Sequence, residues 1–574
     1  MQRQRDLNLK HNYKTGGFMK EKRFWLYKYI IYALLGISSI LMIGFRRDLI
    51  DVGIGQGAFF KYFIPFIIVI ALRRILMMID RAKSKVNYSI LQVKNEEDLI
   101  DKWIKISIAN LENPENRNLY DGCLSESNYK EKLIDSQALM IKNLVIIIGT
   151  LFILFAYNKL FAIVLLALVC ILISIEALSL RKAGDIWISY RSNMRRANYF
   201  SNVLINSKYL SERKVFTTSE FFNDKFSDEF SSASKTNKAL GRGRFIRDMA
   251  YDLSFIGLII LYILTFSRSN VPGFSLGLFT SLFYQLIEVK LTVSDMVLNF
   301  FNYKSAALVE NNYKKFFDLE EEKSGDKSLD TIKSIEFKAV HFTYPNSDKE
   351  VLSGLSFKLD QGSYGLVGEN GSGKSTITKL MMGLYEVTCG QILINGLDIS
   401  TYKKSDLKDA MALVFQSSHH YPAILKENLD FKGGLKYDED LAEALGIDEI
   451  ISSLPKGMDT DLSAISKDAV SMSGGQWQRL GIMRALNKDA SLYILDEPNA
   501  LLDPISEAKM YGKYLEILDG KISLLISHRL GATKLMDEII VLRKGKIYAK
   551  GSHEDLMERS YYRDLYNTQK EMYL

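Results

Sequence analysis

Long apolar runs in the first half of the sequence constrain the fold of this chain more than any other feature. A bilayer-spanning helix needs about 20 mostly apolar residues, and such runs recur between residues 24 and 287. They predict six membrane-spanning helices in three pairs: Phe24–Phe45 with Ala58–Leu72, Leu144–Tyr157 with Leu160–Leu180, and Leu253–Phe266 with Phe274–Ile287. The second run is the least regular, because it is short and contains Lys61 and Pro65.

The links between these runs predict how the chain is oriented in a membrane. Links within a pair are short, whereas those at about 73–142 and 181–252 are long, charged and helical in pattern. Basic residues gather in the long links and in the N-terminal arm, and the positive-inside rule then places both in the cytosol. Everything after the sixth span is cytosolic as well. Arg46 and Arg47 fall on the outer side, against the rule.

The chain divides into four parts by composition. With 574 residues it is too long for one compact domain. We predict a basic arm at 1–23, a transmembrane domain at 24–318, a charged linker at 319–331 and a soluble domain at 332–574. In the soluble domain short apolar strands alternate with helices, which is typical of an α/β fold on a largely parallel sheet.

Charge and cysteine content exclude several classes of protein. The net charge of +7 lies in basic clusters beside apolar runs, which favours membrane topology over nucleic-acid binding. Cys123, Cys170 and Cys389 are far apart, so neither a disulfide scaffold nor a zinc site is expected. No small-residue cleavage site follows the first apolar run, so we expect no cleavable signal peptide.

The sequence GENGSGKST, at residues 368–376, predicts a phosphate-binding loop. It fits the pattern G-x-x-x-x-G-K-[ST] and lies between an expected strand and an expected helix, which is the context this motif requires. Backbone N–H groups of the loop and the positive end of the helix would bind phosphate oxygens. Lys374 would reach the β- and γ-phosphates of ATP, and Ser375 would ligate Mg²⁺. The candidate ATP-binding residues here are Gly368, Glu369, Asn370, Gly371, Ser372, Gly373, Lys374, Ser375 and Thr376.

Two carboxylates follow a second buried strand, in the sequence SLYILDEP at 491–498. Acidic residues at the carboxyl end of such a strand would lie beside the phosphate loop. We expect Asp496 to hold the Mg²⁺ shell and Glu497 to polarise the attacking water.

At this point the sequence resembles the ATP-binding-cassette (ABC) family, and in particular exporters in which six spans are fused to one cassette. The resemblance covers nearly the whole chain. It implies a membrane α-helical domain of the type I/IV ABC exporter kind plus a cytosolic α/β P-loop ATPase domain. It also explains SMSGGQ at 471–476, since signatures of this type bind the γ-phosphate of ATP held by the other cassette of a dimer. The residues concerned are Ser473, Gly474, Gly475 and Gln476.

The resemblance implies roles for four further residues. Tyr344 corresponds to the aromatic residue that stacks on adenine, and Gln416 to the glutamine that contacts Mg²⁺. His528 corresponds to the switch histidine at the γ-phosphate, so Glu497 and His528 are the expected catalytic pair. Asp503 falls where the two cassettes exchange contacts.

The sequence departs from the family pattern in three places. Met472 replaces the usual leucine at the start of the signature, which is a mild change because methionine fills a similar apolar volume. Leu501 stands near a position where the family has a small residue. The segment DTDLSAISKDAV lacks the usual glycine–glutamate pair, which puts the relay between cassette and membrane domain in doubt.

Weaker signals lie outside the ATP site. The segments Ala109–Asp121 and Ser211–Phe226 resemble the cytosolic tips that dock onto cassettes. Glu176 and Glu288 would either line a substrate path or lie at the cytosolic interface. We interpret His419 and His420 as part of a solvated loop.

The predicted function is ATP-driven export by alternating access in a dimer located in the plasma membrane. ATP and Mg²⁺ are the expected cofactors, and no nucleic acid is expected as partner. The signature wording and the tips favour a peptide substrate of the bacteriocin or lantibiotic type, with lipid or a hydrophobic drug as the alternative. A homodimer is favoured, while a heterodimer and a non-transporting ATP-switched scaffold remain open.

Overall fold

The computed structural model describes residues 2–55, 59–267, 275–345, 347–416, 419–431, 437–463, 467–497, 514, 516–527 and 533–572. Within these ranges the side chains of residues 2–21, 54–55, 176–185, 187–188, 191, 207, 240, 244, 247, 266–267 and 569–572 are not described. The chain forms two compact units. The helical unit comprises residues 1–101 and 119–318, and the sheet unit comprises residues 102–118 and 319–574.

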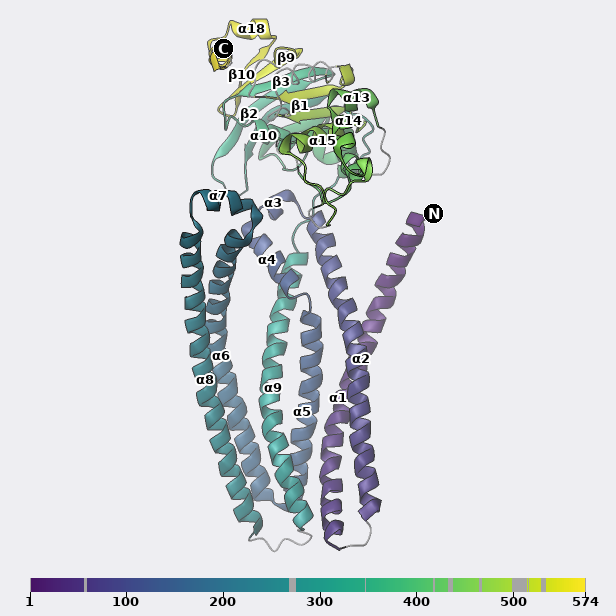
Figure 1. Cartoon of the computed structure of the whole chain (residues 1–574), viewed down its shortest axis with the longest axis vertical. Helices are drawn as coiled ribbons and strands as arrows, with labels where there is room; N and C mark the ends of the chain where they lie inside the picture. The colour runs from purple at the N-terminus through teal and green to yellow at the C-terminus, as the bar shows by residue number, and fades with distance from the viewer. Residues whose placement is uncertain are drawn as a thin grey trace. The chain divides into compact units, whose positions relative to one another are not determined.

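Long helices build the helical unit (Figure 1). In the described part of the chain they are α1 (Gln2–Gly55), α2 (Phe59–Lys105), α5 (Tyr129–Tyr157), α6 (Lys159–Ile205), α8 (Ser219–Ser267) and α9 (Leu276–Phe317). The shorter α4 (Pro114–Ser125) and α7 (Leu210–Val215) lie between them in sequence. α6 packs beside α8, and α5 packs beside α9 and α1. The long charged links are therefore helical, as predicted, and most of them continue the spans.

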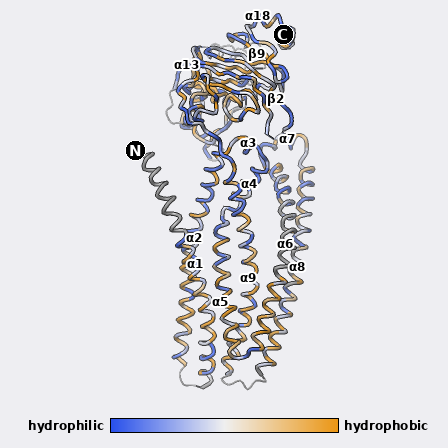
Figure 2. The backbone as a smooth tube through the Cα atoms, turned by 180° about the vertical axis from the view of Figure 1, so that it is seen from behind, coloured by the Kyte–Doolittle hydropathy of each residue, from blue (hydrophilic) through white to orange (hydrophobic). Residues whose placement is uncertain are grey.

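Five of these helices, α1, α2, α5, α8 and α9, are long and apolar enough to cross a membrane by length and composition. They contain five of the six predicted spans. The remaining predicted span, Leu160–Leu180, falls on α6, whose described apolar part, Lys159–Ile175, is shorter. Figure 2 shows the apolar residues concentrated in the halves of the long helices that lie away from α7.

Helix ends in this unit are set by individual polar residues. Asn158 alone separates α5 from α6, and its side chain accepts a hydrogen bond from the Phe161 amide at 3.0 Å. At the start of α9, Asp51 of α1 accepts hydrogen bonds from the Ser275 hydroxyl and, at 2.8 Å, from the Gly277 amide. A Cβ on Gly277 would lie 2.2 Å from the Arg47 carbonyl oxygen, so the absence of a side chain permits this close approach of α1 and α9.

Two sheets form the framework of the sheet unit. The larger has the order β10-β9-β3-β8-β7-β6, with every described pair parallel except β10 with β9. Its strands are β3 (Gly362–Gly368), β6 (Met411–Val414), β7 (Leu492–Asp496), β8 (Ile522–Ile526), β9 (Glu538–Arg543) and β10 (Lys546–Gly551). β7 and β8 are buried along nearly their whole length, which explains their continuous apolar sequences. The predicted parallel α/β fold is confirmed.

A second, antiparallel sheet was not predicted from the sequence. It has the order β2-β1-β4-β5 and consists of β1 (Ile335–Thr343), β2 (Glu350–Leu359), β4 (Cys389–Ile394) and β5 (Leu397–Asp398). One apolar core joins both sheets with α10 (Lys374–Met381). A second core packs α12 (Leu425–Leu429), α13 (Glu439–Ala444), α14 (Ile447–Ser453) and α15 (Gly474–Leu486) against β7. The described residues of the unit also form the α-helices α3 (Ile108–Leu111), α11 (Lys404–Ala410), α18 (His553–Met557) and α19 (Ser560–Met572).

The predicted linker at 319–331 is packed against the sheet unit. Leu329 is 8% exposed within the core, and its amide donates to Asp406 at 3.2 Å. Lys327 forms a β-bridge with Tyr402. The segment has the charged composition of the predicted linker, and the burial of Leu329 together with backbone hydrogen bonds holds it against the sheet unit.

Candidate functional site

The predicted phosphate loop joins the end of β3 to the start of α10. Gly371 and Gly373 adopt φ values of +77° and +110°, a region that favours glycine. A Cβ on Gly373 would also lie 2.7 Å from a Leu352 methyl carbon. These glycines let the backbone turn tightly enough to aim the first amides of α10 outward, which is the geometry that binds a phosphate group.

Polar groups inside the loop are arranged for an anion. The Ser372 hydroxyl is buried and has no hydrogen-bond partner among the described residues. The Lys374 ammonium donates to the carbonyl oxygens of Gly368 at 2.8 Å and Glu369 at 3.1 Å. Burial lowers the pKa of Lys374, while the charges of Glu497 and Asp496 oppose that shift. A buried hydroxyl without a partner and a desolvated ammonium both fit the phosphates of a nucleotide.

Asp496 and Glu497 lie beside this loop, as predicted from their place after β7. Burial, and then the charge of Glu497, raise the pKa of Asp496 to about 6, while Lys374 acts in the opposite direction. Glu497 accepts a hydrogen bond from the Gln416 side-chain amide at 2.7 Å and has a φ of +48°. The structure thus brings Lys374, Asp496, Glu497 and Gln416 to the carboxyl edge of the parallel sheet, although they come from three separate motifs.

The signature Ser473–Gln476 opens α15 with a capping box. The Ser473 hydroxyl accepts from the Gln476 amide at 3.2 Å, and the Gln476 side chain accepts from the Ser473 amide at 2.8 Å. The sequence showed this device, because S-x-x-Q is a capping pattern, but we interpreted it only as an anion site. Met472 is 8% exposed within the second core, which is consistent with an apolar role.

Tyr344 lies next to the phosphate loop. Its hydroxyl is 3.0 Å from the Thr376 hydroxyl, and its ring contacts Tyr385 edge to face at 5.4 Å between centroids. The Lys379 ammonium is 5.2 Å from the ring centre. This position, half-buried at one side of the loop, is compatible with the predicted contact to a base.

Several predicted residues lie outside the part of the chain that the structure describes. Among the site candidates these are His528 and Asp503. The atypical Leu501 and part of the segment before the signature, at 464–466, also lie outside it, as does the side chain of Glu176.

Comparisons with known proteins identify the family. Residues 352–500 match the ABC transporter family. Over 488 residues the chain is 30% identical to the subtilin transport ATP-binding protein of Bacillus subtilis, covering 83% of this chain and 78% of that protein. The chain belongs to the ABC transporter family. As predicted, it combines an ATP-hydrolysing domain with a membrane domain and couples ATP hydrolysis to transport.

Other relatives extend the similarity along the chain. The nisin transport ATP-binding protein of Lactococcus lactis is 24% identical over 96% of this chain and 95% of its own length. An ATP-dependent lipid A-core flippase of Haemophilus ducreyi is 32% identical over 54% of each protein. A solved structure, an ATP-bound bacterial Atm1-family ABC exporter, covers 95% of this chain with a TM-score of 0.77 and 20% identity. The match also covers 98% of that exporter chain. This similarity confirms the predicted exporter fold.

His419 and His420 are exposed in an irregular segment, in agreement with the expected solvated loop, and their rings also contact neighbouring aromatic side chains. The His420 ring stacks on Trp477 of the signature helix at 4.5 Å and 12°. His419 lies edge-on to Phe415 at 6.1 Å and Tyr421 at 6.5 Å between ring centroids. The sequence could not predict this contact, because 56 residues lie between His420 and Trp477 in the chain and only the fold brings them together.

Arg484 is a residue that the sequence analysis missed. It projects from α15 and donates to the Asn428 carbonyl oxygen at 2.6 Å. Its guanidinium also lies over the rings of Tyr421 and Phe431, at 5.1 and 5.0 Å from their centres. These contacts line a groove of about 370 Å³. Arg484 therefore ties the signature helix to the segment that follows Gln416.

Residues 102–118, which include part of one predicted tip, belong to the sheet unit. Ile108 and Ala109 pack against its main core. Glu112 accepts a hydrogen bond from the Tyr385 hydroxyl, and Lys102 pairs with Glu321 at 3.0 Å. This segment therefore lies in the same compact unit as the ATP site.

Proposed function

We propose that this ABC transporter exports peptides from the cytosol and works as a homodimer. The observation that carries the proposal is the extent of similarity: the relatives named for subtilin and nisin transport align along 83% and 96% of this chain. That similarity includes the membrane domain, where a substrate passes. It supports the lantibiotic-like peptide substrate predicted from the sequence.

Lipid transport is the second candidate. The relatives named as lipid A-core flippases support it, but the Haemophilus ducreyi protein aligns with only 54% of this chain. An alignment of that length carries less information about the substrate path. A hydrophobic drug has no such support among these relatives.

Mg²⁺ fits the residues at the ATP site. This cation prefers oxygen ligands, and Ser375, Asp496 and Gln416 all provide them at the edge of the sheet that carries the phosphate loop. When bound, it would neutralise charge on the phosphate oxygens. Asp496 would bind the cation as a carboxylate, although burial raises its pKa to about 6.

The residues of this chain divide the remaining work among themselves. Lys374 would release the Gly368 and Glu369 carbonyl oxygens and bind the terminal phosphates. Glu497 would orient the attacking water and accept its proton, a role in which a positioned carboxylate typically contributes about 10²–10⁴-fold in rate. Gln416 holds the Glu497 carboxylate at 2.7 Å, so it would position that base.

The dimer follows from the position of the signature in the sequence and from the family. Ser473 and the first amides of α15 would complete the ATP site of a second chain. Each half-site of this chain has its motif residues, which supports a homodimer over a heterodimer. The same completeness argues against a scaffold that uses ATP only as a switch, because such a protein would not need Glu497. The N-terminus and the sheet unit would be cytosolic, with the helical unit in the plasma membrane.

The test is the ATPase activity of this chain expressed alone and reconstituted in lipid, beside Glu497→Gln. Strong hydrolysis that the substitution abolishes supports a working homodimer. A folded wild-type protein that binds ATP but does not hydrolyse it contradicts the homodimer and indicates a missing partner chain or a scaffold.

A further inference from the structure

A group of charged side chains on α2, α5 and α9 lies close together in the helical unit, and we call it the charged layer. It consists of Arg73 on α2, Lys142 on α5, and Glu288 and Asp295 on α9. The guanidinium of Arg73 lies 3.8 Å from the Glu288 carboxylate and donates to the Ser39 hydroxyl of α1 at 2.9 Å. The charges that act on Lys142 are those of Asp295, Arg73 and Glu288. Four helices therefore contribute to one polar region.

The predicted spans end at Leu72 and Ile287, and another begins at Leu144, but the lengths of α2, α9 and α5 place Arg73, Glu288 and Lys142 within the thickness of a bilayer. At a rise of about 1.5 Å per residue, Glu288 is about 18 Å from the first residue of α9, and Arg73 is about 21 Å from the first residue of α2. Lys142 is about 22 Å from the last residue of α5 by the same measure. A bilayer has a hydrocarbon core about 30 Å thick. Charges at this depth are costly and are kept where they have a function, typically along a substrate path.

A polar stripe extends the layer along α9 and onto α5. Polar residues recur on α9 every three or four positions, which places them on one face of the helix; they are Ser281, Gln285, Glu288, Thr292, Asp295 and Asn299. The Gln285 amide donates to the Thr150 hydroxyl of α5 at 3.0 Å.

Asn143, two turns before Thr150 on the same face of α5, is fully buried. Neither polar atom of its side chain has a partner among the described residues. Hydrogen bonding between helices explains Thr150 and Gln285, but it does not explain Asn143 or the charges.

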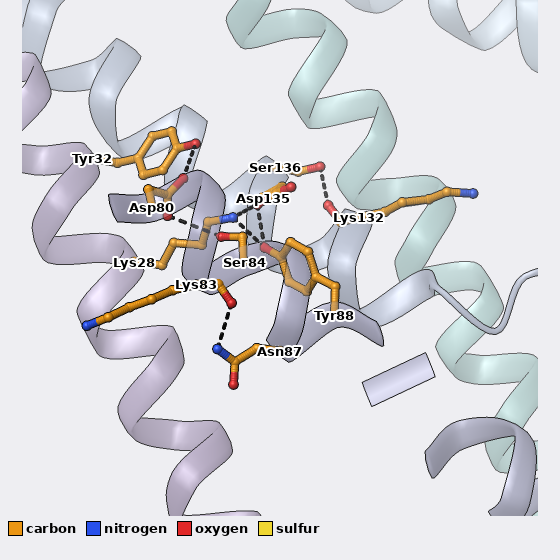
Figure 3. Close-up of polar contacts among 10 residues, drawn as sticks. All are labelled: Lys28, Tyr32, Asp80, Lys83, Ser84, Asn87, Tyr88, Lys132, Asp135 and Ser136. Carbon is orange, nitrogen blue, oxygen red and sulfur yellow. Dashed lines mark hydrogen bonds and ion pairs between the residues drawn. The ribbon is translucent and has the colours of Figure 1, made fainter. Parts of the chain in front are cut away.

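A second charged cluster in the same unit shows what a purely structural arrangement looks like (Figure 3). Lys28 of α1 is 1% exposed and pairs with both Tyr88 of α2 and Asp135 of α5. The Tyr88 hydroxyl donates to the same Asp135 carboxylate at 2.5 Å. Each charge there faces its partner at hydrogen-bond distance and is closed off from solvent on the lysine side.

The charged layer differs from that cluster in the exposure of its basic residue and in its spacing. The Arg73 side chain is 30% exposed against 2% for Lys28, whereas the acids are similar, at 26% for Glu288 and 34% for Asp135. The 3.8 Å between Arg73 and Glu288 also exceeds hydrogen-bond length. Asp295 is exposed. Arg73 and Glu288 lie near each other but do not form a hydrogen-bonded ion pair, so their charges remain available to a ligand.

We propose that the charged layer is a substrate-binding site for a peptide that carries both acidic and basic groups. Arg73 and Lys142 would bind its carboxylates, and Glu288 and Asp295 would bind its ammonium or guanidinium groups. A phospholipid whose head group carries only negative charge would use only the basic half. A zwitterionic head group offers one charge of each sign, so a layer with two charges of each sign favours a peptide. This inference rests on the proposed function and names the substrate class within it.

The experiment exchanges the two charges of one pair. The double variant Arg73→Glu/Glu288→Arg keeps opposite charges facing each other but reverses their positions. Its transport is measured in proteoliposomes with three synthetic peptides of equal length: one of mixed charge, one in which the acidic residues are replaced by lysine, and one in which the basic residues are replaced by glutamate. Thermal unfolding of each purified variant reports folding. The matched control is Lys314→Glu/Glu310→Lys, an exposed ion pair on the same helix with its atoms 3.4 Å apart.

We expect the Arg73/Glu288 exchange to change the ratio of apparent affinities for the lysine and glutamate peptides by about tenfold or more, and the control exchange to leave it unchanged. A folded exchange variant with wild-type affinities for all three peptides overturns the proposal, because the pair then serves only to hold the helices.

If the exchange variant does not fold, Glu288→Gln and Arg73→Gln test the same point. The first should weaken transport of the lysine peptide, and the second that of the glutamate peptide. Equal loss for both peptides overturns the proposal.

The wild-type protein separates this inference from the proposed function. Wild-type transport of the mixed-charge peptide with no effect of the exchange contradicts the charged layer alone. No peptide transport by an ATP-hydrolysing wild type, together with flipping of an anionic lipid that depends on Arg73, contradicts both and identifies a lipid transporter.

Discussion

The ATP site and the charged layer are built in opposite ways. At the ATP site each functional residue belongs to a short motif, and parallel strands carry those motifs to one edge of a sheet. In the charged layer the partners are single residues on long helices, such as Arg73 and Glu288, with no motif around them. The edge of the sheet thus brings together residues that sequence motifs already identify. Helix packing brings together residues that no sequence pattern connects.

The largest predicted effect concerns the motif side of this comparison. Glu497→Gln should reduce ATP hydrolysis by about 10²–10⁴-fold, because the amide cannot accept a proton from water. Steady-state phosphate release in lipid measures it. Asp489→Asn is the matched control, since Asp489 lies in the same unit but is 91% exposed. A loss of less than about tenfold would show that another group is the base.

The next effect concerns helix packing. Gly277→Ala places a Cβ 2.2 Å from the Arg47 carbonyl oxygen and 2.7 Å from the Asp51 carboxylate. Overpacking of this kind typically costs about 1–3 kcal/mol, so the midpoint of thermal unfolding in detergent should fall. Gly44→Ala on α1, where a Cβ meets nothing within 4 Å, should leave the midpoint unchanged or raise it, because alanine favours a helix. Equal midpoints for both variants would contradict the close approach of α1 and α9.

A third prediction concerns pH and the ATP site without nucleotide or metal. The pKa of Asp496 is raised to about 6, so the folded protein keeps a proton that the unfolded chain releases at lower pH. This bound proton stabilises the folded state at low pH. Between about pH 5 and pH 7 its contribution to the free energy of unfolding falls as the pH rises, by at most on the order of 1 kcal/mol. Unfolding curves in EDTA should therefore show a smaller decrease of stability with pH in Asp496→Asn than in the wild type. The same dependence of stability on pH in both proteins would indicate that the pKa of Asp496 is not raised in the folded state.

The smallest effect concerns the polar stripe. Gln285→Leu removes the 3.0 Å hydrogen bond to Thr150, and such bonds between membrane helices average about 0.6 kcal/mol. We expect only a slight fall in the midpoint of thermal unfolding. Adding Thr150→Val to this variant should lower the midpoint even less, because the hydrogen bond is already absent. A large loss of stability would show that the packing of α5 on α9 depends on this bond. It would weaken the distinction between polar residues that hold helices together and the charged layer.

These expectations reflect how much the sequence reveals about each region. The phosphate loop, the Asp496–Glu497 pair and the parallel sheet were predictable because glycine spacing and buried strands have local signatures. The antiparallel sheet was missed, since strands such as β1 and β4 are far apart in the sequence and their pairing includes a register shift. The charged composition of 319–331 likewise gave no sign that Leu329 is buried, because its surroundings include residues far along the chain, such as Asp406.

In the membrane domain the sequence predicted the helices but not their contacts. Lys28 falls within the predicted span Phe24–Phe45, and only the structure shows that it is buried against Asp135 and Tyr88. Glu288 was left between a substrate path and the interface, because its partner on α2 lies 215 positions earlier in the chain. Hydropathy fixes where a helix crosses a bilayer, but which faces meet depends on packing that single residues such as Gly277 decide.

The most direct test of the central claim is ATP-dependent uptake of a labelled mixed-charge peptide into inside-out vesicles that contain this chain alone. The account predicts uptake with ATP and Mg²⁺ in the wild type, and none with Glu497→Gln or without nucleotide. Equal uptake by the wild type and Glu497→Gln, or no uptake by a wild type that hydrolyses ATP, would contradict ATP-driven peptide export by this protein.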